Sequence, residues 1–253
     1  MILTPLYRAY EWFLERRVRQ GKLPEHIGVI MDGNRRLARR LGAQPWMGHR
    51  LGAQKLEEFL EWCIQLGIKT VTTYAFSTEN FRRPKDEVEK LFDIFEEYFY
   101  KIADDERIHR NRVRIKAIGK IERFPERVRR AIRHAERCTS GYDNLLLNVA
   151  MAYGGRQEIV DAFRKMGEKI ERGEMRASEI TEEEVSRHLY TTGLPDPDLI
   201  IRTSGEERIS GFLLWQSAYS ELYFCESYWP GFRKIDFLRA LRTYQQRQRR
   251  FGR

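Results

Sequence analysis

Six short apolar runs recur along the chain, and each is separated from the next by a longer stretch. The runs span residues 27–31, 71–76, 113–118, 145–151, 199–202 and 222–225. Strands that are apolar on both faces are typical of parallel sheets, in which crossover helices join neighbouring strands. The pattern therefore predicts an α/β fold in which helices flank a mainly parallel, six-stranded central sheet.

The stretches between the runs have the periodicity of amphipathic helices. We expect helices over residues 51–66, 85–104, 125–138, 157–172, 182–190 and 235–249. In the second of these, apolar residues from Val88 to Ile102 recur every three or four positions and form one stripe. No linker or repeat divides the 253 residues, so we expect one domain over residues 23–253.

Residues 1–22 form a separate feature, an amphipathic helix. Apolar and aromatic residues such as Leu6, Tyr10 and Phe13 fall at helical spacing, with arginines on the other side. The segment is too charged to cross a bilayer. It either packs on its own domain or docks on an anionic membrane surface.

The net charge of +9 implies attraction to an anionic partner, which is nucleic acid, a membrane surface or a phosphorylated substrate. Three dispersed cysteines and five scattered histidines argue against a disulfide framework and a zinc site. We therefore expect a reducing compartment, the cytoplasm, with peripheral membrane association as the alternative that the first helix raises.

The loops that follow the predicted strands are polar and cationic. They read "DGNRR", "STENFRRP", "YGGR" and "RTSGEERIS". Ligands of open α/β sheets bind beyond the carboxyl ends of the strands, and guanidinium groups grip phosphate oxygens in pairs. Neither GxxxxGK[ST] nor a GxGxxG after a strand is present, which argues against an ordinary ATPase or dinucleotide dehydrogenase. The loops therefore predict a phosphate-binding rim.

Asp32 stands between the first apolar run and a cluster of arginines. Its carboxylate suits an ion pair, an Asp-Gly turn or a metal ligand. A Mg²⁺ ion that bridges a diphosphate to the protein needs at least one such carboxylate.

Seven segments in fixed order resemble the cis-prenyltransferases, the undecaprenyl and dehydrodolichyl diphosphate synthases. They are "HIGVIMDGNRRLAR", "GHRLGAQKL", "YAFSTENFRRP", "LNVAMAYGGRQEIV", "DLIIRTSGEERISGFLLWQSAYSELYF", "WPGF" and "RRFGR". The resemblance implies a Mg²⁺-dependent homodimeric transferase that adds isopentenyl diphosphate repeatedly to an allylic starter, farnesyl or geranylgeranyl diphosphate. The product would be a long cis-polyprenyl diphosphate, the precursor of a lipid carrier for glycosylation or cell-envelope synthesis.

The resemblance also implies roles for single residues. Asp32 would hold Mg²⁺ and assist ionisation, and Asn80 would position the isopentenyl group. The allylic diphosphate would bind to Gly33, Asn34, Arg36 and His49, with Arg35 as a further contact. The loop residues expected near the substrates are Ser77, Glu79, Phe81 and Arg83. Isopentenyl diphosphate would bind to Arg202, Arg208 and Ser210, and Glu221 would be a second metal-associated carboxylate. Arg250 and Gly252, in an Arg-x-Gly tail, would reach the partner subunit's site.

Departures from the bacterial pattern bear on the starter. Arg35 and Leu37 replace a Gly and a Trp, Phe81 replaces a Trp, and Pro45 stands where an arginine is common. The Arg-Arg form resembles archaeal and eukaryotic members and leaves the starter open.

We expect no nucleic-acid binding, because the arginines lie at strand ends rather than along one recognition helix. An inactive partner subunit is the other alternative, but Asp32 is retained and favours a catalytic homodimer.

Overall fold

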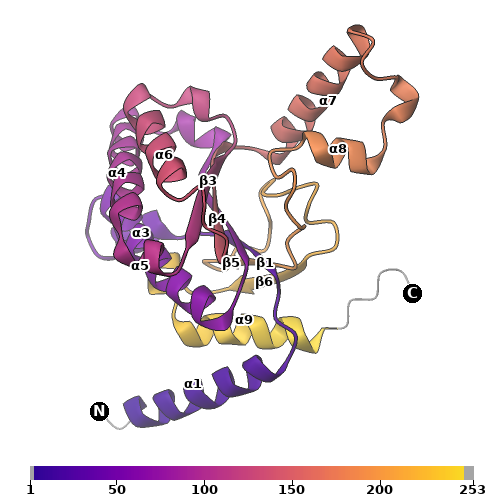
Figure 1. The fold of residues 1–253 in the computed structure, drawn as a ribbon. Coiled ribbons are helices and arrows are strands. Elements are labelled where there is room, and N and C mark those ends of the chain that lie inside the picture. Colours follow the sequence, from indigo (N-terminus) through magenta and orange to yellow (C-terminus); the bar gives the residue numbers. More distant parts are fainter. Residues whose placement is uncertain (1–2, 248–253) are drawn as a thin grey trace.

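The computed structural model describes residues 3–247 and contains one six-stranded sheet (Figure 1). The strands are β1 (His26–Ile30), β2 (Thr70–Ser77), β3 (Val113–Ile118), β4 (Leu145–Tyr153), β5 (Leu199–Thr203) and β6 (Glu221–Cys225). Their order is β3-β4-β2-β1-β5-β6, and every neighbouring pair is parallel. The predicted α/β class and six-stranded parallel sheet are confirmed.

The helices connect these strands and flank the sheet. They are α1 (Leu3–Gln20), α2 (Asn34–Arg40), α3 (Pro45–Leu66), α4 (Lys85–Asp104), α5 (Glu106–Arg110), α6 (Glu126–Cys138), α7 (Gly155–Glu171), α8 (Glu182–His188) and α9 (Lys234–Gln246). Helix α3 begins at Pro45, six residues earlier than periodicity suggested, because proline suits the first helical turn. Helices α2 and α5 are too short to show a period, so the pattern missed them.

The two faces of the sheet are covered differently. Ile27 and Val29 of β1 pack into the main core with α3, α4, α6 and α9. Ile30 points to the opposite face, which Phe212 and Leu213 of an irregular segment cover. The chain after β1 therefore passes to one face, whereas the chain after β5 passes to the other.

The carboxyl ends of β1 and β5, where the chain diverges, are the usual ligand position in such sheets. Ile30 of β1 lies opposite Arg202 of β5 in the parallel register. Asp32, two residues beyond Ile30, consequently emerges beside Arg202.

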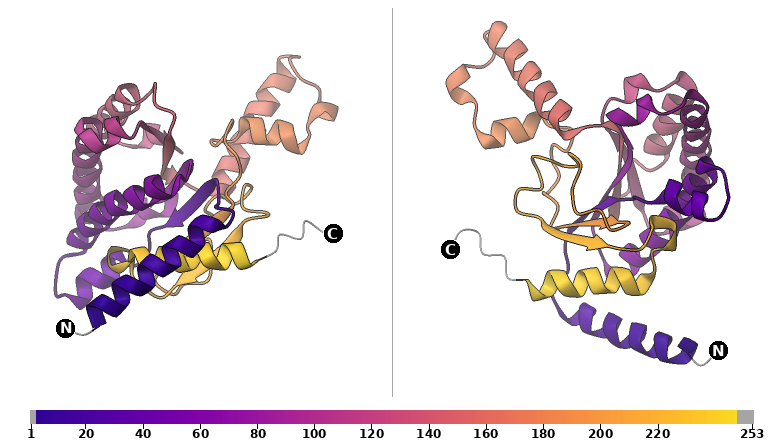
Figure 2. Two further views of the ribbon diagram at one scale, coloured as in Figure 1. Left: turned by 60° about the horizontal axis from the view of Figure 1, so that its bottom comes forward. Right: turned by 180° about the vertical axis from the view of Figure 1, so that it is seen from behind.

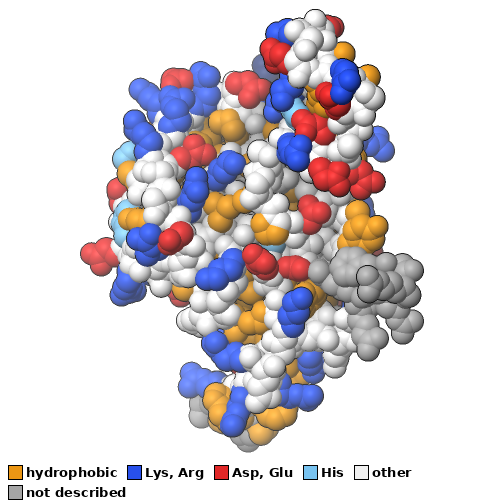
Figure 3. Space-filling view, turned by 45° about the vertical axis from the view of Figure 1, so that its right-hand side comes forward, with side chains coloured by type: hydrophobic (Ala, Val, Ile, Leu, Met, Phe, Trp, Pro, Cys, Tyr) orange, Lys and Arg blue, Asp and Glu red, His pale blue; other side chains and the backbone are white. Residues whose placement is uncertain are grey.

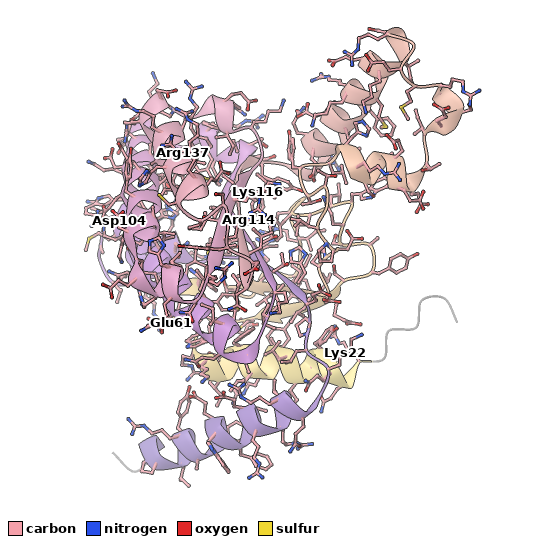
Figure 4. The ribbon with its side chains drawn as sticks, viewed as in Figure 1. Lys22, Glu61, Asp104, Arg114, Lys116 and Arg137 are labelled. Carbon is pink, nitrogen blue, oxygen red and sulfur yellow. The ribbon has the colours of Figure 1, made fainter. Side chains whose placement is uncertain are left out.

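Helices α7 and α8 form an arm that projects from the body (Figures 1 and 2). The arm has its own small core, which includes Met166, Met175 and Val185. At the far edge of the sheet, β3 carries Arg114 and Lys116, labelled in Figure 4. Charged side chains on an edge strand discourage pairing with another chain.

Helix α1 packs along α9, and the two lie side by side in every ribbon view (Figure 2). Leu14 and Val18 are buried, and Lys234 of α9 pairs with Glu15 at 2.8 Å.

The outer face of α1 is exposed. Leu6, Trp12 and Phe13 on this face are 66%, 62% and 50% exposed. Figure 3 shows hydrophobic side chains among basic ones at the bottom of the molecule. None of the described helices is long and apolar enough to cross a membrane.

We predict that Trp229→Ala lowers the free energy of unfolding by about 3–5 kcal/mol, the usual cost of removing a buried aromatic ring. Trp229 is fully buried, stacks on Phe232 with centroids 5.7 Å apart, and donates a hydrogen bond to the Gly52 carbonyl at 2.8 Å. Urea titration would measure the change. Trp12→Ala is the matched control, and an equal loss there would contradict the assignment of Trp229 to the core.

Candidate active site

Asp32 is held in place by its own backbone and by β5. Its N–H donates to Thr203 Oγ1 at 3.0 Å and to the Ile30 carbonyl at 2.9 Å. Its Oδ1 accepts from the Gly33 N–H at 2.7 Å. Gly33 has φ of 97°, and a Cβ there would lie 2.7 Å from the Tyr228 ring, so this turn requires glycine.

The second oxygen of Asp32 faces two guanidinium groups. Oδ2 lies 2.8 Å from Arg202 Nη2 and 3.2 Å from Arg36 Nη2. Burial raises the pKa of Asp32, but the hydrogen bonds from Arg202 and Gly33 and the charges of Arg202 and Arg36 outweigh burial and lower the pKa. Asp32 is therefore ionised at neutral pH.

Arg202 is the buried member of this group, with 5% of its side chain exposed. Its Nη1 donates to Ser210 Oγ at 2.8 Å and to the Arg208 carbonyl. Buried charges persist only when they are paired and hydrogen-bonded, so these contacts fix the segment after β5 against β1.

Glu206 joins two of the predicted phosphate-binding arginines. It accepts from Arg36 at 2.9 Å and from Arg208 at 2.5 Å. Glu206 lies in the "RTSGEERIS" loop but was not among the predicted site residues. Two acids between two arginines in that loop are the sequence feature that could have indicated Glu206.

A second cluster surrounds Glu87 of α4, another residue that sequence reasoning missed. Arg35 Nε and Arg83 Nη1 lie 3.3 and 3.2 Å from its Oε1, and His49 Nε2 lies 3.8 Å from it. Arg83 also donates to His49 Nε2 at 3.4 Å. Burial, together with the charges of Arg83 and Arg35, lowers the pKa of His49 to about 3. His49 is therefore neutral and offers Nε2 as an acceptor.

The loop after β2 forms the 3₁₀ turn Thr78–Arg82. Asn80 Oδ1 accepts a hydrogen bond from the Ser77 N–H at 2.9 Å and closes the turn.

The Phe81 ring packs edge-on against the Phe76 ring, with centroids 4.9 Å apart. The Arg123 guanidinium lies over the Phe81 ring, 4.0 Å from its centroid. Glu79 is exposed. Asn80 and Phe81 thus hold the loop in shape through these contacts.

Two adjoining cavities follow from this arrangement. A basic pocket of about 290 Å³ is lined by Met31, Asp32, Gly33, Asn34, Arg35, Arg36, Arg39, His49 and Arg83. Arg39 is an addition to the predicted set. An apolar cavity of about 400 Å³ lies between α3 and α4, and Met31, Asn34 and His49 line both spaces. Ala75 of β2 and Leu147 and Val149 of β4 supply the sheet side of the apolar cavity.

Some predicted site residues are not brought together. Glu221 lies at the amino end of β6, level with Ile27, and pairs with Arg247 at 2.8 Å. Asp32 is five residues beyond Ile27, about 16 Å along the strand direction. One chain therefore does not bring Asp32 and Glu221 to the same metal ion. Arg250 and Gly252 lie outside the described residues.

The Asp32 carboxylate alone offers too few oxygen ligands for a hard cation, so a bound substrate must supply the others. Among residues 3–247, no group of three or more His, Cys, Asp or Glu side chains could hold a metal. Mg²⁺ in proteins is commonly bound by one or two carboxylates plus substrate phosphates. The ionised Asp32 side chain is 29% exposed, and its arginine neighbours favour an anion. These residues fit a Mg²⁺ ion that arrives on a diphosphate.

Comparison with known proteins agrees with this geometry. Residues 30–252 match a family model described as "Putative undecaprenyl diphosphate synthase". The chain belongs to the cis-prenyltransferases. This enzyme is 58% identical over 251 residues to a Methanopyrus kandleri protein named tritrans,polycis-undecaprenyl-diphosphate synthase (geranylgeranyl-diphosphate specific), covering 99% of this chain and 93% of that one. It is 55% identical over 253 residues to an isoprenyl transferase of Thermus thermophilus, covering 98% and 96% of the two chains.

Solved structures give the same result for this cis-prenyltransferase. Lavandulyl diphosphate synthase from Lavandula x intermedia, in complex with dimethylallyl diphosphate, matches with a TM-score of 0.86 and 37% identity over 91% of this chain and 99% of that one. A probable undecaprenyl diphosphate synthase from Campylobacter jejuni matches with a TM-score of 0.74 and 34% identity over 92% and 99%. The predicted family and enzyme class, a transferase that elongates cis-prenyl chains, are confirmed.

We predict that His49 makes stability fall as the pH is lowered. Its pKa is 6.5 when unperturbed but about 3 in the fold, so below about pH 6.5 the unfolded chain binds the proton first. In His49→Gln, the loss of unfolding free energy between about pH 6.5 and about pH 4.5 should shrink by roughly 1–2 kcal/mol. Urea titrations at both pH values measure this. His134→Gln, on α6, is the control, and identical pH profiles for wild type and His49→Gln would refute the prediction.

Proposed function

We propose that this enzyme adds isopentenyl diphosphate units in cis geometry to a geranylgeranyl diphosphate starter and releases a long polyprenyl diphosphate, the precursor of a lipid carrier. The observation that carries the proposal is the junction at Met31, Asn34 and His49, where a basic pocket meets an apolar cavity. One space suits a diphosphate and the other suits a hydrocarbon chain. The starter rests on relatives such as the Methanopyrus kandleri protein, whose name specifies geranylgeranyl diphosphate.

The allylic diphosphate occupies the basic pocket in this proposal. Arg35, Arg36 and Arg39 stabilise the negative charge that develops on the leaving diphosphate. Mg²⁺, when bound to Asp32 and the diphosphate, supplies further charge neutralisation. His49, being neutral, accepts a hydrogen bond without adding charge. The allylic carbon lies where the basic pocket meets the apolar cavity.

Isopentenyl diphosphate binds through the segment after β5. Arg208 is 61% exposed in its side chain and is held near Arg36 by their shared partner Glu206. A second diphosphate can take the place of the Glu206 carboxylate between the two guanidinium groups. Ser210 and the buried Arg202 anchor this segment to Asp32, so the two substrates meet beside the carboxyl ends of β1 and β5.

A homodimer is the assembly that the exposed apolar side chains support. Val160 and Phe163 on α7 are 44% and 47% exposed, and Leu214 and Tyr219 on the segment beside the arm are 37% and 72% exposed. Such side chains on one side of a molecule are typical of interfaces. The Arg250–Gly252 tail is proposed, by the resemblance alone, to complete the partner's site.

We predict that the purified chain, with Mg²⁺, labelled isopentenyl diphosphate and geranylgeranyl diphosphate, produces long cis-polyprenyl products. Asp32→Asn should reduce kcat on the order of 100-fold or more, because the leaving diphosphate loses its metal anchor. Chromatography of extracted lipids gives both rate and product length.

Asp86→Asn, an exposed acid in the first turn of α4, is the matched control and should retain full activity. Circular dichroism verifies that both variants fold. Wild-type turnover in Asp32→Asn would refute the role of Asp32. Faster turnover with farnesyl diphosphate would refute the proposed starter.

Peripheral membrane association is proposed for α1. Its outer face carries Trp12 and Phe13, and Arg16 and Arg17 lie over these rings with centroid distances of 5.6 and 5.8 Å. Aromatic residues flanked by arginines suit the headgroup region of an anionic membrane.

We predict that Trp12→Ser with Phe13→Ser weakens binding to vesicles containing phosphatidylglycerol by about tenfold or more, because two aromatic side chains no longer enter the lipid. Co-sedimentation measures binding, and phosphatidylcholine vesicles test the part played by charge. Tyr100→Ser, on α4, replaces another exposed aromatic side chain and is the control. Unchanged sedimentation of the double variant would eliminate the membrane role of α1.

A further inference from the structure

The apolar cavity ends in charge at the side opposite to the basic pocket. Its near end is lined by Met31, Asn34 and His49, and its far end by Glu57, Glu61, Asp105 and Arg107. From His49 to Glu61, α3 rises by about 18 Å. The walls between are apolar and include Ile94, Phe95 and Phe99. A hydrocarbon chain that enters from the site meets hydrocarbon until it reaches these charged side chains.

Arg107 of α5 is the centre of this group, which we call the Arg107 cluster and define as Arg107, Glu57, Glu61 and Asp105. Its guanidinium lies 2.9 Å from Glu57 and 2.6 Å from Glu61, both on α3. It also lies 2.7 Å from Asp105, which caps α5 by accepting from the Arg107 N–H at 2.8 Å. Three carboxylates and one guanidinium thus tie α5 across the far end of the cavity.

The outer side of the cluster is in water. The Arg107 and Glu61 side chains are 41% and 43% exposed, whereas Glu57 and Asp105 are 18% and 15% exposed. Exposed ion pairs are weak and are screened by salt, so these can separate and remain hydrated. They cannot be covered by hydrocarbon without losing that hydration. The cluster is therefore a barrier to an apolar chain, but a barrier that can open.

The far end lies on the same side of the molecule as α1. Gln65, which also lines the cavity, accepts a hydrogen bond from Arg19 of α1 at its carbonyl, at 2.8 Å. Figure 4 labels Glu61 at the lower end of the helical layer, facing the side where α1 lies. A chain that passes the cluster would leave the protein beside α1.

We propose that the Arg107 cluster is a gate that limits the length of the polyprenyl product; the inference rests on the proposed chain elongation. The chain grows at its diphosphate end, so each addition pushes the free end further along the cavity. Once the free end reaches the cluster, the next addition requires the ion pairs to separate. Elongation then slows relative to release, and products of that length accumulate.

The test compares product lengths in Arg107→Ala, Arg107→Lys and the wild type. Arg107→Ala removes the ion pairs that tie α5 to α3 across the far end and should shift the mean product by at least one isoprene unit towards longer chains, with the rate of the first addition unchanged. Arg107→Lys keeps the charge and should restore most of the wild-type distribution. Arg112→Ala is the matched control: Arg112 is also exposed and pairs with Asp143 at 2.9 Å, outside the cavity lining.

Salt gives a second readout that needs no variant. High sodium chloride screens the ion pairs and should lengthen the products of the wild type and of Arg112→Ala, but not those of Arg107→Ala. Equal lengths for wild type and Arg107→Ala, with no response to salt, would overturn the gate while the products themselves uphold the proposed elongation. Absence of any prenyl product from the wild type would overturn both.

Discussion

The ion pair between Asp32 and Arg202 connects the parts on which the site depends. It joins the end of β1 to β5 at 2.8 Å, where the chain leaves the sheet towards opposite faces. Arg202 also holds the segment after β5 through Ser210, and Gly33 follows Asp32 into α2. Because Arg202 is buried, its charge must be satisfied by these partners, and the loops that bear the other arginines are positioned as a consequence.

Four other arginines of the site are paired with carboxylates that occupy positions suited to phosphate. Glu206 lies between Arg36 and Arg208, and Glu87 lies against Arg35 and Arg83. These pairs keep like-charged guanidinium groups close together in the free enzyme, where their repulsion would otherwise separate them. In the proposed function, a diphosphate would therefore meet guanidinium groups that are already oriented.

Much of the fold was predictable from the sequence, because strands buried on both faces must be apolar runs and their loops must lie at one edge of the sheet. Asp32 and Arg36 were predictable for the same reason. Glu221 was expected to be a second metal-associated carboxylate, but a motif shows order along the chain and not which end of a strand a residue occupies. Glu87 was missed because an acid in the first turn of a helix is typical of a solvated face, and only the fold shows it to be buried.

The junction of the two cavities depends on close helix packing that periodicity does not reveal. Gly48 and Gly52 lie one turn apart on α3, and a Cβ on either would fall 2.0 or 2.4 Å from oxygens of Asn34. Only glycine lets α2 approach α3 so closely. That approach puts Asn34 in the walls of both the basic pocket and the apolar cavity. The same pair of glycines therefore sets how directly the basic pocket opens onto the apolar cavity, and hence, in the proposed function, where the growing chain would run.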